Sequence, residues 1–434
     1  MIQPKTLPGF MELLPQDQIQ FNRIKNIIQD TFESYGFLPI DTPEIELAEI
    51  LLAKAGGETE KQIYRFNKGD NDLALRFDLT VPLAKYVAKN YGELTFPFRR
   101  YQIAKVFRGE RPQKGRYREF YQTDIDIIGD GELSISNDAL LPKIIYSIFK
   151  ELDVGDFKIY INNRKLLSGY LKFLDVKEEN QAEVLRVIDK IEKMEEEKIL
   201  SWLVELIEDN EKVNKILEFI KIDGNNDEKI EKLKNMQIDN EIFAEGLKEL
   251  EEVTRKIKTF GVPDENFEIN LSIVRGLDYY TGTVYETFLV DHREFGSVCS
   301  GGRYDNLAEH YTDKKLPGVG ISIGLTRFFK ALKDNNLIKE YKSTSKVLVV
   351  PMIENLEYVG KISNDLRENG INNEIYLEDK KIKTKFKYAD KLEIPYVIVI
   401  GESEVAENKV TLKEMESGEQ SLLTIEEAIN KIKG

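Results

Sequence analysis

The sequence predicts an α+β protein with an antiparallel-sheet core, an all-helical insertion and a C-terminal α/β domain. Two strand-like runs, residues 98–107 and 119–128, flank a basic loop and together predict a hairpin. No proline occurs between Pro142 and Pro263, and most of that interval has helical periodicity. From Val347 onward, apolar strands alternate with helical segments. At roughly 150 residues per domain, a chain of 434 residues suggests about three folded units.

Composition excludes several classes of protein. Hydrophobic residues make up 41% and charged residues 32%, as in soluble globular proteins. No apolar run is long enough to span a membrane, and residues 1–20 lack the pattern of a secretory signal. We therefore expect a cytoplasmic protein. The net charge of −15 disfavours sequence-blind binding of nucleic acid, although local basic patches can still contact it.

Cysteine and histidine are scarce. The chain has one cysteine, Cys299, and two histidines, His292 and His310. An internal disulfide is therefore excluded, and a zinc site lacks ligands at suitable spacing. Neither histidine lies in a motif that supports nucleophilic catalysis. We expect Cys299 to be a small buried residue.

The predicted hairpin has the highest concentration of side chains suited to ligand binding or catalysis. Its loop, residues 108–118, contains five basic residues and one acidic residue, and long loops in compact domains are usually functional. In the second strand, alternation places an aromatic, an amide and two carboxylates on one face: Phe120, Gln122, Asp124 and Asp126. This face and loop could bind a nucleotide together with a cationic or polar small ligand. The alternative is a solvated face with a basic tip.

The proline-free interval changes character along its length. Residues 155–176 look mixed, with a strand at 158–161, whereas the segment from Lys177 to Val262 is helical. Spacing of i, i+3, i+4, i+7 predicts one helix through Val184, Val187, Ile188, Ile191 and Met194. A Gly-Asn-Asn-Asp break at 224–227 separates later helices.

Strands return after the helical interval, at residues 284–290 and 318–323. A polar stretch near 340–345 precedes a strand at 347–350, helices at 358–369 and 381–392 with a further strand between them, and a strand at 396–400. This order predicts a small α/β unit with a mainly parallel sheet. The predicted divisions are 1–162 (first part of the core), 163–262 (helical insertion), 263–340 (second part of the core) and 345–434 (C-terminal domain).

Five motifs in this order resemble those of the histidyl-tRNA synthetases, which are class II aminoacyl-tRNA synthetases. Gly36–Glu46 resembles motif 1, Phe107–Gln122 motif 2 and Gly318–Phe329 motif 3. Arg275–Gly282 and Ser300–Asp305 resemble the two segments peculiar to the histidine enzymes. The resemblance covers nearly the whole chain. It implies a class II catalytic core, an anticodon-binding domain and a homodimer formed through motif 1.

The resemblance implies the ATP site. Arg108 would hold the α-phosphate, Glu110 would approach the adenine amino group, and Phe120 would stack on adenine. Arg327 would cover the other face and reach the γ-phosphate, and Arg116 would contact phosphates. Guanidinium groups suit this role because they stay charged and bind phosphate oxygens as a fork. The alternative for each arginine is a surface salt bridge. Mg²⁺ would accompany ATP, and the sequence singles out no metal ligand.

The resemblance also implies a histidine site. Arg275 would lie against the α-phosphate and, with Arg108 and Arg327, stabilise the charge of the transition state. The implied histidine-binding residues are Asp78, Thr80, Gln122, Asp126, Arg275, Tyr279, Tyr280 and Tyr304. One branch of the family has Glu where this chain has Asp78 and Asp126. Tyr279 and Tyr280 could instead be core aromatics.

For tRNA, the family uses the motif 2 loop on the acceptor end, which here implicates Gln113, Lys114 and Arg118. The segment 380–391 holds six lysines and one aspartate, and Lys383 and Lys387 share a helical face. In the family this domain recognises the anticodon. The alternative is a solvated lysine-rich helix. The insertion, with a net charge of −8 over 177–258, would need a local basic face to touch tRNA.

The function implied is that of a cytoplasmic histidyl-tRNA synthetase. It would activate histidine with ATP and transfer it to the 3′ end of tRNA(His). An alternative is the regulatory subunit of ATP phosphoribosyltransferase, which resembles the same core but senses histidine. A synthetase-like interaction protein without activity is a third possibility. Intact motif arginines and a complete C-terminal domain argue against both.

Overall fold

The computed structural model describes residues 1–53, 58–111, 115–191, 194–274, 280–306 and 308–434, without the side chains of Glu58 and Thr59. These residues form two compact units. One comprises Met1–Met11 and Ile24–Leu337, and the other comprises Glu12–Arg23 and Ile338–Gly434. Among the described residues, no helix is long and apolar enough to cross a membrane.

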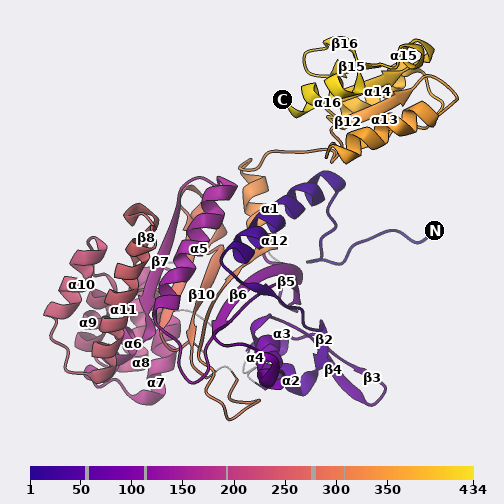
Figure 1. The fold of residues 1–434 in the computed structure, drawn as a ribbon. Helices are drawn as coiled ribbons and strands as arrows, with labels where there is room; N and C mark the ends of the chain where they lie inside the picture. Colours follow the sequence, from indigo (N-terminus) through magenta and orange to yellow (C-terminus); the bar gives the residue numbers. More distant parts are fainter. Residues whose placement is uncertain (54–57, 112–114, 192–193, 275–279, 307) are drawn as a thin grey trace. The chain divides into compact units, whose positions relative to one another are not determined.

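The first unit is built on an eight-stranded sheet (Figure 1). Its neighbouring strands are antiparallel except for β1 with β5 and β7 with β8, which are parallel. In spatial order the strands are β1 (Leu38–Pro39), β5 (Phe98–Phe107), β6 (Glu119–Ile128), β11 (Gly318–Ile323), β10 (Cys299–Tyr304), β9 (Thr283–Leu289), β7 (Phe157–Asn163) and β8 (Phe267–Ile269).

The predicted hairpin is confirmed, with both strands ending at the predicted residues. β5 and β6 pair along their full length, from Phe98 opposite Ile128 to Phe107 opposite Glu119. Ile125 and Ile127 are fully buried on one face of β6, as alternation predicts. The opposite face of β6 is therefore free to carry polar groups.

A smaller three-stranded sheet and several helices complete the framework of this unit. The small sheet has the order β2 (Ile45–Leu47), β4 (Asn71–Leu75) and β3 (Arg65–Lys68). The helices are α2 (Ala48–Leu52), α3 (Glu58–Gln62), α4 (Thr80–Lys89), α5 (Ser136–Leu152), α12 (Leu325–Asp334) and the part of α1 (Pro15–Ser34) from Ile24 onward. Short 3₁₀ turns lie at Tyr91–Glu93, Asp264–Asn266 and Val290–Phe295.

Six helices follow β7 without a strand among the described residues from 164 to 259. They are α6 (Arg164–Phe173), α7 (Glu178–Ile188), α8 (Glu196–Ile207), α9 (Asn210–Ile220), α10 (Asn226–Asn235) and α11 (Glu241–Thr259). The predicted helix through Met194 was too long, since α7 ends at Ile188. The predicted break at 224–227 overlaps the start of α10, where Asn225 and Glu228 form a capping box.

The second unit contains a five-stranded sheet with the order β13 (Asn373–Ile375), β12 (Val347–Pro351), β14 (Tyr396–Ile400), β15 (Val410–Glu414) and β16 (Gln420–Leu423). Its helices are α13 (Glu357–Glu368), α14 (Ile382–Lys391), α15 (Glu402–Glu407) and α16 (Ile425–Lys433). The three strands predicted from the sequence, β12, β13 and β14, pair in parallel as expected. The two additional strands make the sheet mixed, because β14–β15 and β15–β16 are antiparallel. The links into β15 and β16 are too short for parallel crossovers.

Candidate functional site

A pocket of about 500 Å³ lies on the polar side of the large sheet, between β6 and the ends of its neighbours. The motif 2 loop, the turn before α4, strands β9 to β11 and helix α12 all contribute to its wall. The lining residues are Gln62, Asp78, Thr80, Arg108, Glu110, Gly115, Arg116, Tyr117, Phe120, Gln122, Asp124, Tyr280, Tyr285, Glu286, Ser297, Val298, Ser300, Gly301, Ser322, Gly324 and Arg327.

Two buried carboxylates give this pocket an acidic floor. Asp78 is 3% exposed, and burial raises its pKa to about 6 despite a hydrogen bond from the backbone N–H of Val81. Asp124 is 2% exposed, and burial raises its pKa to about 7. One oxygen of Asp78, Oδ2, is buried without a partner among the described residues. A ligand that donates hydrogen bonds or carries positive charge would compensate both groups.

A hydrogen-bond chain fixes the orientation of the floor. The Nε2 atom of Gln122 donates to Ser322 Oγ at 2.8 Å, and the Ser322 hydroxyl donates to Asp124 Oδ1. This direction turns Gln122 Oε1 away from Ser322, and that oxygen is buried without a partner among the described residues. The floor thus presents acceptors to the pocket.

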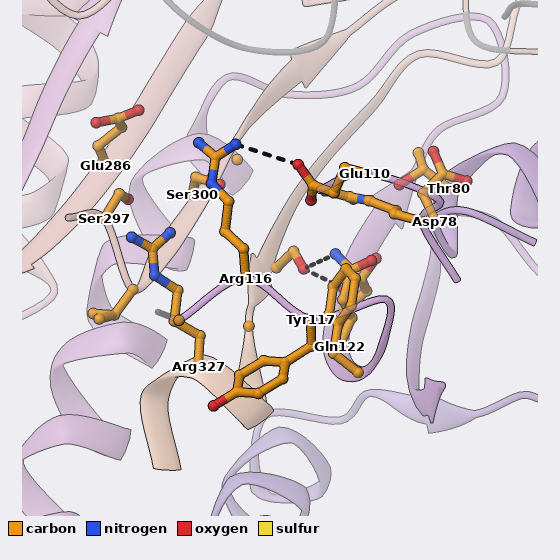
Figure 2. Close-up of a pocket in the computed structure, with 18 of the residues that line it drawn as sticks. Asp78, Thr80, Glu110, Arg116, Tyr117, Gln122, Glu286, Ser297, Ser300 and Arg327 are labelled. Carbon is orange, nitrogen blue, oxygen red and sulfur yellow. Dashed lines mark hydrogen bonds and ion pairs between the residues drawn. The ribbon is translucent and has the colours of Figure 1, made fainter. Parts of the chain in front are cut away.

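Arginines form a basic side of the same pocket. Arg116 pairs with Glu110 at 3.3 Å (Figure 2). Arg327 donates from Nη2 to the carbonyl of Phe295. In this view Arg327, Ser297 and Glu286 lie together, and Asp78 and Thr80 lie across the pocket. Burial and the neighbouring Arg116 lower the pKa of Arg327, although a guanidinium stays charged. An anion beside these two arginines would be stabilised.

The residues expected to bind adenine and the α-phosphate come together at the motif 2 strands. Arg108 donates from Nε to the carbonyl of Phe77 at 3.0 Å, and its guanidinium lies 5.1 Å from the ring centre of Phe120. Both residues line the pocket with Glu110. The strand register places Phe120 on β6 opposite Val106 on β5. This pairing brings the ring of Phe120 close to Arg108, which follows the end of β5.

Asp126 and Tyr304, expected to bind histidine, are not among the lining residues. They lie behind the floor, where Asp126 pairs with Arg100 at 2.5 Å and accepts a hydrogen bond from Tyr304 at 2.8 Å. A Cβ atom at Gly320 would lie 2.1 Å from Asp126 Oδ1, so only glycine fits opposite this carboxylate. In this structure Asp126 and Tyr304 therefore support the wall of the pocket from behind.

The other expected residues divide into four groups. Thr80, Gln122 and Tyr280 line the pocket. Arg118 donates to the carbonyl of Glu110 at 3.0 Å and does not line it. Lys383 and Lys387 are exposed on α14 of the second unit. Arg275, Tyr279, Gln113 and Lys114 lie outside the described residues.

Several lining residues were missed by sequence reasoning, among them Tyr285, Glu286, Ser297, Ser300 and Ser322. Alternation along β6 placed Asp124 on the face that was expected to bind a ligand, although the family resemblance gave this residue no role. Ser300 and Ser322 stand in the segments Ser300–Asp305 and Gly318–Phe329, which the resemblance had singled out, whereas no comparable signal marks Ser297.

Metal ligands are sparse. Among the described residues, no group of three or more His, Cys, Asp or Glu side chains could hold a metal ion. Cys299 is buried, as expected, and burial raises the pKa of its thiol. A site built from protein ligands alone therefore has no basis in the described part of the chain.

Comparisons with known proteins agree along the whole chain. A family model described as histidyl-tRNA synthetase matches residues 9–328, and one described as anticodon binding domain matches residues 346–434. A histidine–tRNA ligase of Clostridium tetani (strain Massachusetts / E88) is 60% identical over 435 residues, covering 100% of this chain and 99% of that protein. One of Finegoldia magna (strain ATCC 29328 / DSM 20472 / WAL 2508) is 52% identical, covering 100% of each. The crystal structure of histidyl-tRNA synthetase from Nostoc sp. PCC 7120 has a TM-score of 0.93 and 40% identity, covering 100% and 99% of the two chains.

Proposed function

The chain belongs to the histidyl-tRNA synthetase family of aminoacyl-tRNA ligases, and we propose that the pocket on its large sheet is where histidine reacts with ATP. The class II fold and the C-terminal anticodon-binding domain belong to the same family. Full-length identity to histidine–tRNA ligases supports this activity rather than that of a histidine-sensing regulatory subunit.

The observation that carries the proposal is the separation of charge inside one pocket. Asp78 and Asp124 make its floor acidic, and Arg116 and Arg327 make one side basic. An amino acid with an ammonium group and an imidazole suits the first region. The phosphates of ATP suit the second, because guanidinium groups bind phosphate oxygens in a fork. Placing both ligands in one pocket holds the carboxylate of histidine near the α-phosphate.

The chemistry is an in-line displacement at phosphorus. A carboxylate oxygen of histidine forms a bond to the α-phosphorus, and the bond from that phosphorus to the bridging oxygen breaks. Pyrophosphate leaves with the electron pair, and histidyl-adenylate remains. A ribose hydroxyl at the 3′ end of tRNA(His) then attacks the activated carbonyl, loses its proton, and AMP leaves.

Residue roles follow from position and from the family resemblance. Asp78 binds the ammonium group with Thr80, Arg108 holds the α-phosphate, and Arg327 reaches the γ-phosphate. Arg275, named from its motif alone, completes the positive surround of the α-phosphate. Fixed cations stabilise the negative charge that develops during displacement.

Mg²⁺ fits this site as a companion of ATP rather than as a resident ion. Mg²⁺ keeps several waters and binds through phosphates with one or two carboxylates. Two lining carboxylates lie beside the arginines, Glu110, which pairs with Arg116, and Glu286, which lies near Arg327. Glu286 would be the protein ligand of the ion. The ion would neutralise phosphate charge.

The tRNA partners and the assembly follow from the same family. The basic face of α14 contacts tRNA through Lys383 and Lys387, and the motif 2 loop contacts the acceptor end through Gln113, Lys114 and Arg118. The chain acts as a cytoplasmic homodimer.

Histidine-dependent ATP–pyrophosphate exchange tests the activation step. We expect exchange with histidine and at least about 10⁴-fold less with alanine or phenylalanine, since a site built on hydrogen bonds rejects ligands that lack them. Exchange that needs no histidine, or that proceeds equally with other amino acids, would contradict the proposal. Histidine binding without exchange would favour the regulatory subunit.

A further inference from the structure

A tight turn near the start of the chain lies against the motif 2 loop, within the first unit. The N–H of Phe10 donates to the carbonyl of Leu7 at 3.1 Å, and Gly9 has a φ of +87°. Proline and then glycine at the two central positions, with φ near +80° at the second, are typical of a type II turn. The hydrogen bond inside the turn uses the carbonyl of Leu7, so the carbonyl of Gly9 is available to another segment.

The carbonyl of Gly9 binds the end of the motif 2 loop, where the chain enters β6. It accepts from the N–H of Arg118 at 2.7 Å and from the N–H of Glu119 at 3.4 Å. The carbonyl of Arg118 in turn accepts from the N–H of Arg108 at 2.9 Å, across the base of the loop. The turn at residues 7–10 therefore holds the last part of the loop through the backbone.

The side chain of Arg118 extends this contact into the loop. A Cβ atom at position 9 would lie 2.9 Å from Cγ of Arg118, 3.1 Å from Cδ and 3.2 Å from Cβ, so the stem of the arginine packs directly on the glycine. The far end of the same side chain donates from Nε to the carbonyl of Glu110 at 3.0 Å. Because Arg118 is held at both ends, a larger residue at position 9 has to displace it.

Two residues that are expected to contact ATP depend on this anchor. Glu110 supplies the carbonyl that Arg118 binds, and Arg116 lies two residues before Arg118 in the chain. Both residues line the pocket, and they pair with each other at 3.3 Å. The start of the loop has an anchor of its own, since the N–H of Gly109 donates to the carbonyl of Gln62 at 2.6 Å. The turn provides the corresponding anchor at the end of the loop.

We propose that Gly9 is a positioning residue for ATP, because the turn, acting through Arg118, fixes the loop residues Glu110 and Arg116. The inference rests on the proposed function, which makes ATP a substrate of this pocket. Gly9 is not among the described residues that line the pocket, so its effect on the reaction passes through other residues. Position 9 requires glycine for two separate reasons. An L side chain is strained at a φ of +87°, and its Cβ atom would collide with Arg118.

The test measures histidine-dependent pyrophosphate exchange by the full-length protein and by Gly9→Ala. We expect Gly9→Ala to raise the KM for ATP by at least about tenfold, since misplacing a binding group by 1 Å can cost roughly 10² in rate. The KM for histidine should stay within about twofold of the parent value, because Asp78 and Thr80 belong to the segment at the start of α4. A variant that was merely less stable would contain fewer active molecules, which lowers kcat and leaves both KM values unchanged.

Two further variants separate the collision from backbone strain. Gly155→Ala is the matched control: Gly155 has a φ of +79°, and no atom of the described residues beyond its chain neighbours lies within 4 Å of a Cβ built there. It should leave the KM for ATP unchanged. Gly9→Asn keeps the collision with less strain, because asparagine tolerates positive φ, and it serves if Gly9→Ala does not fold. A KM for ATP within about twofold of the parent in the Gly9 variants, or an equal rise in Gly155→Ala, would overturn the inference.

Trypsin gives a readout that needs no activity. The loop contains basic residues at which trypsin can cleave, among them Arg111, Lys114 and Arg116. We expect cleavage within residues 108–118 to be faster in the Gly9 variants than in the parent and in Gly155→Ala, because a loop that has lost an anchor opens more often. A parent without histidine-dependent exchange would contradict the proposed function itself. In that case, equal cleavage rates in the parent and the Gly9 variants would overturn the positioning role independently.

Discussion

At the scale of single residues, the site depends on charges that the fold leaves uncompensated. Asp78 and Asp124 are buried with few donors, and the Nε atom of Arg327 is buried without a partner among the described residues. Burial of such groups costs stability in the free protein. Ligand binding can offset this loss of stability, because an ammonium, an imidazole N–H and phosphate oxygens supply the missing partners.

The buried carboxylates make the stability of the free protein depend on pH. The pKa of Asp124 is about 7 when folded and near 3.8 when unfolded. Between these values the folded chain retains a proton that the unfolded chain has released, so stability falls as pH rises through this window. Asp124→Asn removes this contribution. Relative to the parent, the variant should gain on the order of 2 kcal/mol between pH 5 and pH 8, from about 1.4 kcal/mol per pKa unit.

Urea unfolding at pH 5 and pH 8 measures this difference, with exposed Asp130→Asn as the matched control. Asp78 contributes a similar slope up to about pH 6, and it is present in every variant. If the difference in unfolding free energy between Asp124→Asn and the parent is the same at pH 5 and at pH 8, the raised pKa of Asp124 is contradicted.

Arg327 gives a prediction about catalysis. Arg327→Ala removes a partly buried cation from the basic side of the pocket and should slow pyrophosphate exchange by about 10²–10³, the usual effect of removing one preorganised electrostatic interaction. Lys330→Ala, three residues on in α12, removes a partly exposed cation that binds Asp334 at 2.7 Å and should change the rate little. Equal rates for the two variants would remove Arg327 from the mechanism.

At the scale of elements, periodicity predicted where individual strands and helices lie in the chain better than it predicted which strands pair in the sheets. The ends of β5 and β6 could be predicted because alternation continues to the basic loop on both sides. The antiparallel β15 and β16 were missed because short strands with mixed polarity carry a weak signal. Register was also invisible: nothing in the sequence places Arg100 opposite Asp126 and Ser322 opposite Asp124. The assignment of Asp126 to the ligand came from the family resemblance, which does not reveal these strand partners.

Helix α14 carries a prediction for tRNA. Its inner face holds Ala389 and the buried Lys385, whose Nζ donates to the carbonyl of Pro351 at 2.9 Å, whereas Lys383 and Lys387 are exposed. The double variant Lys383→Ala/Lys387→Ala should raise the KM for tRNA. The slope of the logarithm of tRNA affinity against the logarithm of salt concentration should become less steep by about one unit for each phosphate that a lysine no longer neutralises. Histidine-dependent exchange without tRNA should be unchanged.

The second unit offers a matched control that also removes two exposed lysines. Lys361 on α13 and Lys433 on α16 are both exposed, and Lys361→Ala/Lys433→Ala should leave the KM for tRNA near that of the parent. Aminoacylation at several salt concentrations separates the two pairs. If both pairs weaken tRNA binding equally, the effect is one of net charge and α14 is ordinary surface.

At the scale of the whole molecule, exposed apolar residues gather on strands near motif 1. Leu38 on β1 is 60% exposed, and Ile45 and Leu47 on β2 are 49% and 43% exposed. β1 and β2 are edge strands of their sheets, so their outer backbone groups lack strand partners among the described residues. Apolar side chains on open edges favour association with another chain. A two-fold symmetric dimer is the commonest closed solution.

We therefore expect the protein to be a homodimer at micromolar concentration, with about twice the chain mass of 50.2 kDa by light scattering. Leu38→Asp/Ile45→Asp places charges on both edges and should shift the protein toward monomer, because burying an unpaired carboxylate opposes association. Leu422→Asp, at a residue 46% exposed on β16 of the other unit, makes a matched change away from these strands and should remain dimeric. A monomeric parent would contradict the dimer. A parent dimer that Leu38→Asp/Ile45→Asp leaves intact would place its interface on another surface of the chain.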